Sequence, residues 1–400
     1  MSKRKVVLAY SGGLDTSFCV KYLTEDRDFE VHSVLVDTGG FSEEEIIEIE
    51  KKAYELGVTK HTNARVADKY YQDCLRYLVY GNILKNNTYP LSVSAERIFQ
   101  AVAVAEHARS INADAIAHGS TGAGNDQVRF DIAFRIIVPE AEIITPIRDM
   151  KLSREAEIAY LIAKGVVREW HKSMYSINKG LWGTSVGGKE TLTSNQYLPE
   201  SAFPTQVTAT EPVEMSLYFE KGEISGVNGV FHQTPVETIR QIQAIAGPFG
   251  IGRDIHVGDT IIGIKGRVGF EAAAPILIIK AHHVLEKHVL TKQQQILKDQ
   301  LAITYGSMLH EGQFVEPAMR NIEAFMEATQ SHVTGEVKIF LAPYRYHIIG
   351  IESKFDLMSA KFGSYGEMNN AWSGDDVRGF SKVASNQVMI YGKVSEAAGE

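Results

Sequence analysis

The sequence has few cysteines, no long hydrophobic run and no excess of basic residues. Its two cysteines, Cys19 and Cys74, are too few for a disulfide framework or a four-thiolate zinc site, and we expect both to be reduced. The longest apolar run, residues 272–279, is much shorter than the roughly 20 residues that a membrane helix requires. A formal net charge of −8 is unfavourable for a general nucleic-acid binder. We therefore expect a soluble protein without membrane or nucleic-acid partners.

Length and composition indicate a folded chain of more than one domain. The 400 residues exceed one ordinary domain, while 44% hydrophobic and 22% charged residues are close to the average of globular proteins. These values exclude a largely disordered chain, a collagen-like repeat and a coiled-coil rod. The basic start at residues 3–5 leads only into a short apolar run, so we expect no secretory signal and a cytoplasmic location.

The first 165 residues or so alternate β-rich and helical patterns. The expected strands and helices are strands at 6–10, 31–36 and 114–117 and helices at 14–23 and 94–109. A further helix begins after Ser42, which forms a capping box with Glu45, and ends at Gly57. Alternating strands and helices are typical of a parallel sheet with right-handed crossovers. The sequence thus predicts an α/β fold that opens with a Rossmann-like, nucleotide-binding parallel sheet.

After about residue 172 the pattern changes, and glycine and proline become frequent. The expected elements are β-like stretches at 213–219, 259–265 and 276–281, helices at 291–310 and 316–331, and a hairpin at 336–341 and 344–352. The apolar positions of the helix at 291–310 fit either the chain's own core or an interface between subunits. We therefore expect an α+β domain with C-terminal helices, and we divide the chain into residues 1–168, 169–370 and a tail at 371–400.

The turn after the first strand has the features of a phosphate-binding loop. Gly12 and Gly13 allow close backbone approach to an anion, and the following helix offers unpaired N–H groups and the positive end of its dipole. Ser11, Thr16 and Ser17 add hydroxyl donors. The alternative is an ordinary glycine turn capped by serine and threonine. Neither the dinucleotide G-x-G-x-x-G pattern nor a Walker loop is present here.

The complete string Ser-Gly-Gly-Leu-Asp-Thr-Ser, at residues 11–17, is more specific than a single glycine turn. It resembles the pyrophosphate loop of the N-type ATP pyrophosphatases, which split ATP between the α and β phosphates to adenylate a substrate. The loop alone leaves several members open, including GMP synthetase, NAD synthetase, asparagine synthetase and tRNA thiolation enzymes.

A second polar and glycine-rich segment, residues 118–130, follows the strand at 114–117. Ligands of open α/β sheets collect at the carboxyl ends of the strands, so this segment is expected beside the first loop. Asp126 can accept hydrogen bonds from an ammonium group, and Arg129 can bind a carboxylate through two hydrogen bonds. The alternative is a polar surface loop with an Asp–Arg ion pair.

Taken in order along nearly the whole chain, these segments resemble the argininosuccinate synthase family. The matching segments are residues 9–17, 118–119, 121–122, 124–130, 175–177, 185, 250–253, 262–265, 267 and 333–335. The resemblance implies that citrulline, aspartate and ATP give argininosuccinate, AMP and diphosphate. It also implies Mg²⁺ bound with ATP, no metal site made by the chain alone, an adenine nucleotide alpha hydrolase-like domain followed by a synthetase domain, and a homotetramer.

The same resemblance assigns substrate-binding positions residue by residue. For ATP these are Ala9, Tyr10, Ser11, Gly12, Gly13, Leu14, Asp15, Thr16, Ser17, Val36 and Gly119. For aspartate they are Thr121, Asn125 and Asp126, and for citrulline Tyr89, Ser94, Asn125, Arg129, Ser176 and Ser185. No residue is assigned as a catalytic acid or base. Without the resemblance, Tyr89 reads as a half-buried aromatic residue and Ser94 as a helix N-cap, while Lys172 reads as a solvated lysine or a phosphate contact.

Three positions depart from the family pattern. Gly258 and Phe270 stand where the family usually has Glu and Tyr in contact with citrulline, and Ala123 replaces a Lys between the glycines. Asp259, one position away, offers a substitute carboxylate. The departures suggest a smaller and more open pocket wall, so an N-acylated citrulline, with an acetyl or succinyl group, is an alternative substrate.

Two other classes are weighed against the ligase. A tRNA-modifying enzyme with the same loop needs a reactive cysteine pair and a basic surface, which the sequence does not offer. A non-catalytic nucleotide-binding module is expected to have lost part of the loop, yet residues 11–17 are all present. The sequence therefore favours the adenylating ligase.

Overall fold

The structure, a computed structural model, describes residues 3–166, 168, 170, 174–359 and 371–399. Inter-residue contacts divide the chain into two compact units, Met1–Ser353 and Lys354–Glu400. At each of the expected domain boundaries, 168/169 and 370/371, one residue (169 and 370) lies outside the described residues. Lys172, considered above as a phosphate contact, also lies outside them.

The first unit opens with a five-stranded parallel sheet of order β3-β2-β1-β4-β5. Its strands are β1 (Lys5–Ala9), β2 (Glu30–Asp37), β3 (Lys60–Arg65), β4 (Ala115–Ala117) and β5 (Glu142–Ile144). The helices of this region are α1 (Leu14–Lys21), α2 (Glu43–Leu56), α3 (Ala67–Tyr70), α4 (Arg76–Tyr80), α5 (Ser92–Ser110), α6 (Asp126–Ile137), α7 (Pro146–Asp149) and α8 (Arg154–Ala163). The strand order reverses at β1 and β4, where doubly wound folds bind ligands.

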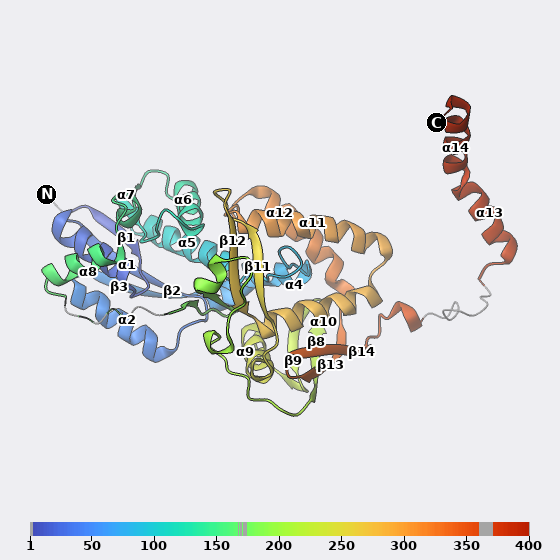
Figure 1. The fold of residues 1–400 in the computed structure, drawn as a ribbon, viewed down its shortest axis with the longest axis horizontal. Helices are drawn as coiled ribbons and strands as arrows, with labels where there is room; N and C mark the ends of the chain where they lie inside the picture. Colours follow the sequence, from blue (N-terminus) through green and yellow to red (C-terminus); the bar gives the residue numbers. More distant parts are fainter. Residues whose placement is uncertain (1–2, 167, 169, 171–173, 360–370, 400) are drawn as a thin grey trace. The chain divides into compact units, whose positions relative to one another are not determined.

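Helices cover both faces of this sheet (Figure 1). Alternate residues of a strand point to opposite faces, so Val6 and Leu8 pack with Leu14 and Phe18 on one side. Val7 faces the other side, in the cluster that holds α5 and α6. The predicted parallel α/β sheet is confirmed. Strands β3 and β5 were missed, because β3 is polar and β5 is only three residues long.

Helix ends in this region follow the predicted signals. The Ser42 hydroxyl accepts from the N–H of Glu45, whose carboxylate accepts from the N–H of Ser42, so the capping box is confirmed. Gly57 ends α2 in the left-handed conformation, with φ 103°. The helix expected at 14–23 is regular to Lys21 and continues in a wider turn at Tyr22–Asp26.

The rest of the first unit contains two antiparallel sheets. One has the order β11-β12-β7-β6 and consists of β6 (Ser176–Asn178), β7 (Thr184–Gly187), β11 (Arg253–Asp259) and β12 (Lys265–Glu271). The other has the order β10-β9-β8-β13-β14 and consists of β8 (Val213–Glu220), β9 (Glu223–Val227), β10 (Val230–Phe231), β13 (Gly335–Ala342) and β14 (Arg345–Glu352). The helices in this part of the first unit are α9 (Pro235–Ala246), α10 (Ala273–Val289), α11 (Lys292–His310) and α12 (Pro317–Thr329).

Two of the expected strands were wrong. Residues 276–281 lie inside α10, where Leu277, Ile278 and Ile279 are all buried. A helix buried on most sides has the same continuous apolar run as a buried strand, so periodicity cannot separate them. Of the stretch at 259–265, only Asp259 and Lys265 are strand residues, at the end of β11 and the start of β12, and residues 260–264 form the turn between them. The strand at 213–219, the helices at 291–310 and 316–331 and the final hairpin are confirmed with small shifts of their ends.

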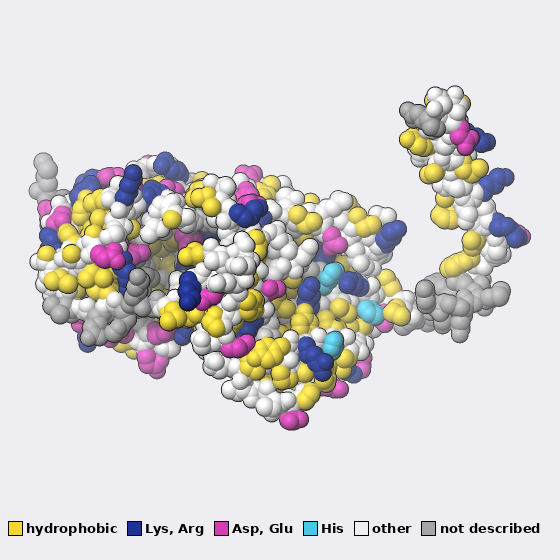
Figure 2. Space-filling view, in the orientation of Figure 1, with side chains coloured by type: hydrophobic (Ala, Val, Ile, Leu, Met, Phe, Trp, Pro, Cys, Tyr) yellow, Lys and Arg dark blue, Asp and Glu magenta, His cyan; other side chains and the backbone are white. Residues whose placement is uncertain are grey.

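The second unit contains α13 (Gly374–Ala384) and α14 (Asn386–Ala398). Hydrophobic side chains lie exposed along both helices, as Figure 2 shows; among them are Phe380, Val383, Ile390 and Tyr391. Over the described residues of the chain, no helix is long and apolar enough to cross a membrane.

Candidate active site

The loop between β1 and α1 is shaped by its two glycines. Gly12 has φ +75°, and a Cβ built there lies 3.1 Å from Cγ1 of Ile49, so a side chain at this position is both strained and crowded. Gly13 is the N-cap of α1 and provides no side-chain cap. The first N–H groups of α1 therefore have no capping side chain as partner and are available to bind a phosphate. Thr16 steadies the loop through a hydrogen bond from Oγ1 to the carbonyl oxygen of Gly13, at 3.3 Å.

This loop opens on a cavity of about 880 Å³ at the carboxyl ends of the parallel strands. The predicted ligand residues that line it are Ala9, Tyr10, Ser11, Gly13, Leu14, Asp15, Thr16, Val36, Gly119, Thr121, Asp126 and Ser176. The predicted residues outside this lining are Gly12, Ser17, Tyr89, Ser94, Asn125, Arg129 and Ser185. The cavity therefore joins the first loop to the segment after β4, as the sheet topology predicted.

The segment after β4 is held by a buried network that begins at His118. The N–H of Ser120 donates to Nδ1 of His118 at 3.1 Å, which leaves Nε2 to donate to Asp131 at 3.1 Å. Arg148 donates to the other oxygen of Asp131 at 2.8 Å. Burial opposes ionisation of Asp131, but these two hydrogen bonds outweigh it and lower its pKa. The network fixes the start of the segment and leaves its glycines to line the cavity.

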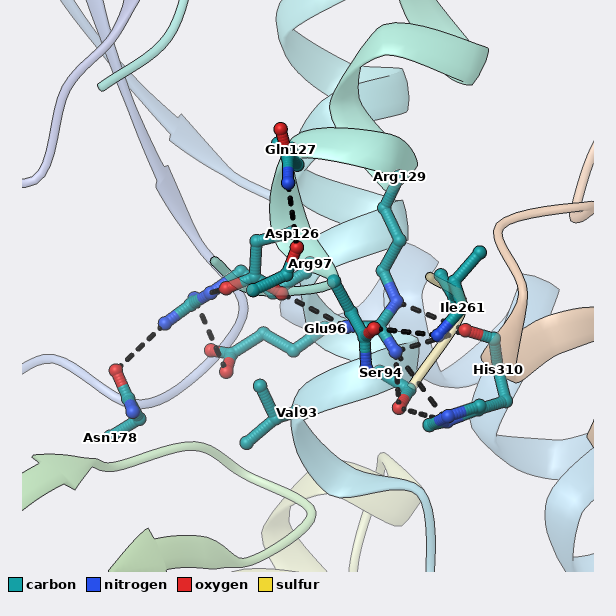
Figure 3. Close-up of polar contacts among 12 residues, drawn as sticks. Val93, Ser94, Glu96, Arg97, Asp126, Gln127, Arg129, Asn178, Ile261 and His310 are labelled. Carbon is teal, nitrogen blue, oxygen red and sulfur yellow. Dashed lines mark hydrogen bonds and ion pairs between the residues drawn. The ribbon is translucent and has the colours of Figure 1, made fainter. Parts of the chain in front are cut away.

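Asp126, at the start of α6, lies between two arginines (Figure 3). Its Oδ1 accepts from Nη1 of Arg129 at 2.9 Å, and its Oδ2 lies 3.4 Å from Nε of Arg97. The expected Asp–Arg pair thus exists, but Arg129 is only 3% exposed, so it is not part of a polar surface loop.

Arg129 is largely occupied by the chain itself. Its Nε and Nη2 donate to the carbonyl oxygen of His310 at 3.1 and 2.9 Å, and Nη2 also donates to Oγ of Ser94 at 3.1 Å. Oγ of Ser94 in turn lies 2.9 Å from Nδ1 of His310. A carboxylate bound by two hydrogen bonds from Arg129 must therefore displace some of these partners. Ser94 lies within α5, which begins at Ser92, so the N-cap alternative was wrong.

Tyr89 and Ser185 are buried beside the cavity rather than in its lining. Tyr89 is 3% exposed, not half-buried; it stacks on His256 at 5.0 Å and packs against Phe270 at 5.5 Å between ring centroids. Ser185, on β7, accepts from Nδ2 of Asn178 at 3.3 Å. Asn125 accepts the N–H of Ile261 at 2.8 Å and so connects the segment after β4 to the β11–β12 turn.

The expected open wall at Gly258 is not found. A Cβ built at Gly258 lies 2.5 Å from Nε2 of His256, so the histidine occupies the space beside this residue. Phe270 is 1% exposed and fills the position next to Tyr89. Asp259 pairs with Lys265 at 2.5 Å, and both side chains are exposed. The space gained by losing larger side chains is thus taken up by the chain itself.

The sequence interpretation missed three side chains that meet in the cavity, those of Glu96, Arg97 and Asn178 (Figure 3). Arg97 donates from Nη2 to Oδ1 of Asn178 at 2.9 Å and from Nη1 to Gln100 at 2.8 Å. Glu96 is 5% exposed and accepts from Oγ1 of Thr38 at 2.6 Å. Arg97 lies three residues after Ser94, on the same face of α5, and this spacing was the signal that could have revealed it.

Comparison with known proteins decides between the members of the wider superfamily. Residues 5–167 match the model of the arginosuccinate synthase N-terminal HUP domain, and residues 175–391 match that of the arginosuccinate synthase C-terminal domain. The chain belongs to the argininosuccinate synthase family. Its members are ATP-using ligases of arginine biosynthesis that form AMP and diphosphate, and this chain is one of them.

Full-length relatives agree with the family models. The argininosuccinate synthase of Methanocaldococcus jannaschii is 36% identical over 392 residues, which cover 97% of this chain and 98% of the relative. That of Dictyoglomus thermophilum is 36% identical over 394 residues, covering 98% of both chains. That of Xanthomonas campestris pv. campestris is 34% identical over 408 residues, covering 99% and 100%. The similarity therefore extends over both family domains.

Proposed function

We propose that the chain joins citrulline to aspartate in the cytoplasm through a citrullyl-adenylate, with release of AMP and diphosphate. The observation that carries this proposal is the cavity shared by the β1–α1 loop and the segment after β4. One side offers N–H and hydroxyl donors for phosphates, and the other offers Thr121 and Asp126 for an amino acid. ATP and an amine nucleophile can thus meet in one cavity.

The chemistry explains why ATP is split at its α phosphate. The ureido carbon of citrulline is a poor electrophile, because two nitrogens donate electrons to it and its oxygen cannot leave. Adenylation of that oxygen makes it a good leaving group, and the α-amine of aspartate then attacks. The chain has to position the reactants and stabilise charge, and positioning alone contributes about 7–11 kcal/mol in favourable cases.

The residue roles follow the family resemblance. We propose that residues 9–17, Val36 and Gly119 bind ATP, that Thr121, Asn125 and Asp126 bind aspartate, and that Tyr89, Ser94, Asn125, Arg129, Ser176 and Ser185 bind or position citrulline. Lining of the cavity supports the ATP set apart from Gly12 and Ser17, and it supports Thr121, Asp126 and Ser176. Tyr89, Ser94, Arg129 and Ser185 are buried next to it, so their roles require either indirect support of the substrate or a rearrangement on binding.

Mg²⁺ is proposed to enter with ATP. Among the described residues no group of three or more His, Cys, Asp or Glu side chains could hold a metal ion. Mg²⁺ does not need such a group, because it is often held by substrate phosphates and one or two carboxylates. Asp15 lines the cavity at the phosphate loop and is a carboxylate that would hold the ion. The ion would neutralise charge on the departing diphosphate.

We also propose a homotetramer and a division into residues 1–168, 169–370 and 371–400. The end of one family model at 167 and the start of the next at 175 support the first boundary. The exposed hydrophobic side chains of α13 and α14 support association of the chain with other copies, because such residues are rarely left in water over two consecutive helices.

The test is to incubate the purified protein with ATP, aspartate and citrulline, omitting one amino acid at a time. Sustained diphosphate release is expected only with both amino acids present. Release of ADP and orthophosphate would contradict the proposal. A second series with N-acetylcitrulline and N-succinylcitrulline decides the acceptor: preference for an acylated form would change the substrate while preserving the chemistry.

A further inference from the structure

The second half-reaction requires a proton acceptor, because aspartate carries an ammonium group at neutral pH and only the free amine is a nucleophile. The acceptor has to lie in the cavity, close to the proposed aspartate position at Asp126. Six titratable side chains among the described cavity residues have to be compared as acceptors: Tyr10, Asp15, Glu45, Glu96, His118 and Asp126.

Most of these groups are poorly suited to accept a proton. Asp126 already pairs with two guanidinium groups, so both of its carboxylate oxygens are engaged. His118 uses both ring nitrogens in the network with Ser120 and Asp131. Burial raises the pKa of Tyr10 to about 12, so its neutral hydroxyl holds its own proton.

Two of the three remaining carboxylates are engaged elsewhere. Glu45 is exposed and accepts the N–H of Ser42 in the capping box of α2. Asp15 belongs to the phosphate loop and hydrogen-bonds to the buried carboxyl group of Glu157. Both therefore serve the nucleotide end of the cavity and not the aspartate end.

Glu96 has the required position and environment. It lies on α5 and lines the cavity, and its Oε2 is 3.7 Å from Nη1 of Arg97, the guanidinium that also contacts Asp126 (Figure 3). One guanidinium thus separates Glu96 from the proposed aspartate position. Burial raises the pKa of Glu96 and makes the carboxylate a better base, while Arg97 and the Thr38 hydroxyl oppose this shift.

We propose that Glu96 is a catalytic residue that accepts a proton from the α-ammonium group of aspartate. This inference rests on the proposed function. Glu96 takes one ammonium proton, and the freed lone pair forms the new C–N bond to the ureido carbon. The C–O bond to AMP then breaks, with its electron pair remaining on the phosphate oxygen. A second proton leaves the same nitrogen for the AMP phosphate or for water, and the product is a guanidinium.

Glu96→Gln tests this role because glutamine keeps the size of the side chain and can still accept from Thr38, but it is not a base at neutral pH. The adenylation half-reaction is measured as citrulline-dependent exchange of labelled diphosphate into ATP without aspartate. We expect this exchange to stay within about threefold of the wild type, while argininosuccinate formation falls by about 100-fold or more. Glu106→Gln, an exposed residue on the same helix, is the matched control and is expected to change neither rate.

The pH profile separates a base from a structural carboxylate. In the wild type, argininosuccinate formation should fall at low pH as Glu96 becomes protonated, and this acidic limb should be absent in Glu96→Gln. Glu96→Asp should retain the limb with a reduced rate. Thr38→Val removes a hydrogen bond that lowers the pKa of Glu96, so the limb should move to higher pH while most of the rate remains.

Three results overturn the role of Glu96: equal losses in both half-reactions of Glu96→Gln, an acidic limb that persists in that variant, or a Thr38→Val variant as inactive as Glu96→Gln. If Glu96→Gln does not fold, the limb in Glu96→Asp and Thr38→Val still decides. Failure of the proposed function would look different, because the wild type itself would then show no citrulline-dependent exchange.

Discussion

The phosphate loop and the buried cluster around Arg129 are both candidate substrate contacts, yet they are built in opposite ways. The loop leaves the N–H groups at the start of α1 without a side-chain cap and lines the cavity. Arg129 instead donates to Asp126, Ser94 and the carbonyl of His310 and is nearly inaccessible. The loop is prepared for a ligand, whereas the cluster also holds α5, α6 and α11 together. Substitutions in the two regions should therefore fail differently.

The largest effect is expected for Arg129→Gln. Removing this guanidinium leaves the buried Ser94 and the His310 carbonyl without their donor, and breaking such buried pairs typically costs about 3–5 kcal/mol. The free energy of unfolding, measured by urea denaturation, should fall by about 3 kcal/mol. Arg135→Gln, at an exposed position on the same helix, should leave it unchanged. A stable but inactive Arg129→Gln variant would show that the cluster is organised for substrate alone.

Asp126→Asn should affect the ligation step more than stability. The carboxylate is 37% exposed in its side chain, so its loss leaves less buried charge, but two arginines lose their counter-charge. Argininosuccinate formation should fall by about 100-fold, a loss of the size seen when one charge-assisted contact is removed. Citrulline-dependent diphosphate exchange should fall only a few-fold. Equal losses in the two assays would contradict its assignment to aspartate.

Gly12→Val should weaken ATP binding without affecting the Arg129 cluster. The left-handed conformation costs a residue with a Cβ about 1–2 kcal/mol, and the valine also meets Ile49. We expect the free loop to relax out of this conformation and ATP binding to restore it, so that ATP affinity by calorimetric titration is roughly tenfold weaker, since about 1.4 kcal/mol corresponds to one power of ten. Gly57→Ala is the control: it has the same type of strain, with φ +103°, but lies at the end of α2 and should leave ATP affinity unchanged.

The smallest effect is expected at Glu157, which supports the loop from α8. Burial and the neighbouring Asp15 raise its pKa to about 8. Because this pKa is above the unfolded value, the folded state binds the proton more tightly, and the resulting stability is complete below about pH 4.5 and is lost as pH rises towards 8.

Glu157→Gln removes this titration. As the pH is raised from 5 to 9, the melting temperature of the variant minus that of the wild type should therefore increase. A difference that is constant over this range would place the proton elsewhere in the loop.

The parts of the site that could be predicted from the sequence are those formed by consecutive residues. The phosphate loop and the segment after β4 are continuous strings at strand ends, so their shape depends mainly on local backbone chemistry. The meeting of Arg97, Glu96 and Asn178 depends on packing β6 against α5, and no local pattern announces it. The same limit explains the strand expected at 276–281, whose apolar run becomes a helix because neighbours cover it on most sides.

The departures at Gly258 and Phe270 give a similar lesson. Gly258 is smaller than the usual Glu, and Phe270 is less polar than the usual Tyr. The size of a pocket, however, depends on what fills the vacated space. His256 occupies the side of Gly258, and Phe270 packs on Tyr89. A substitution predicted to enlarge a site can thus leave it as compact as before.

The hydrogen bond from Arg97 to Asn178 also joins the two family domains at the cavity. Asn178 lies on β6, in the region of the C-terminal family domain, whereas Arg97 belongs to the nucleotide-binding domain. Separating β6 from α5 would remove one of the hydrogen bonds that orient the Arg97 guanidinium beside Asp126. The arrangement of Arg97 around Asp126 therefore depends on residues from both family domains.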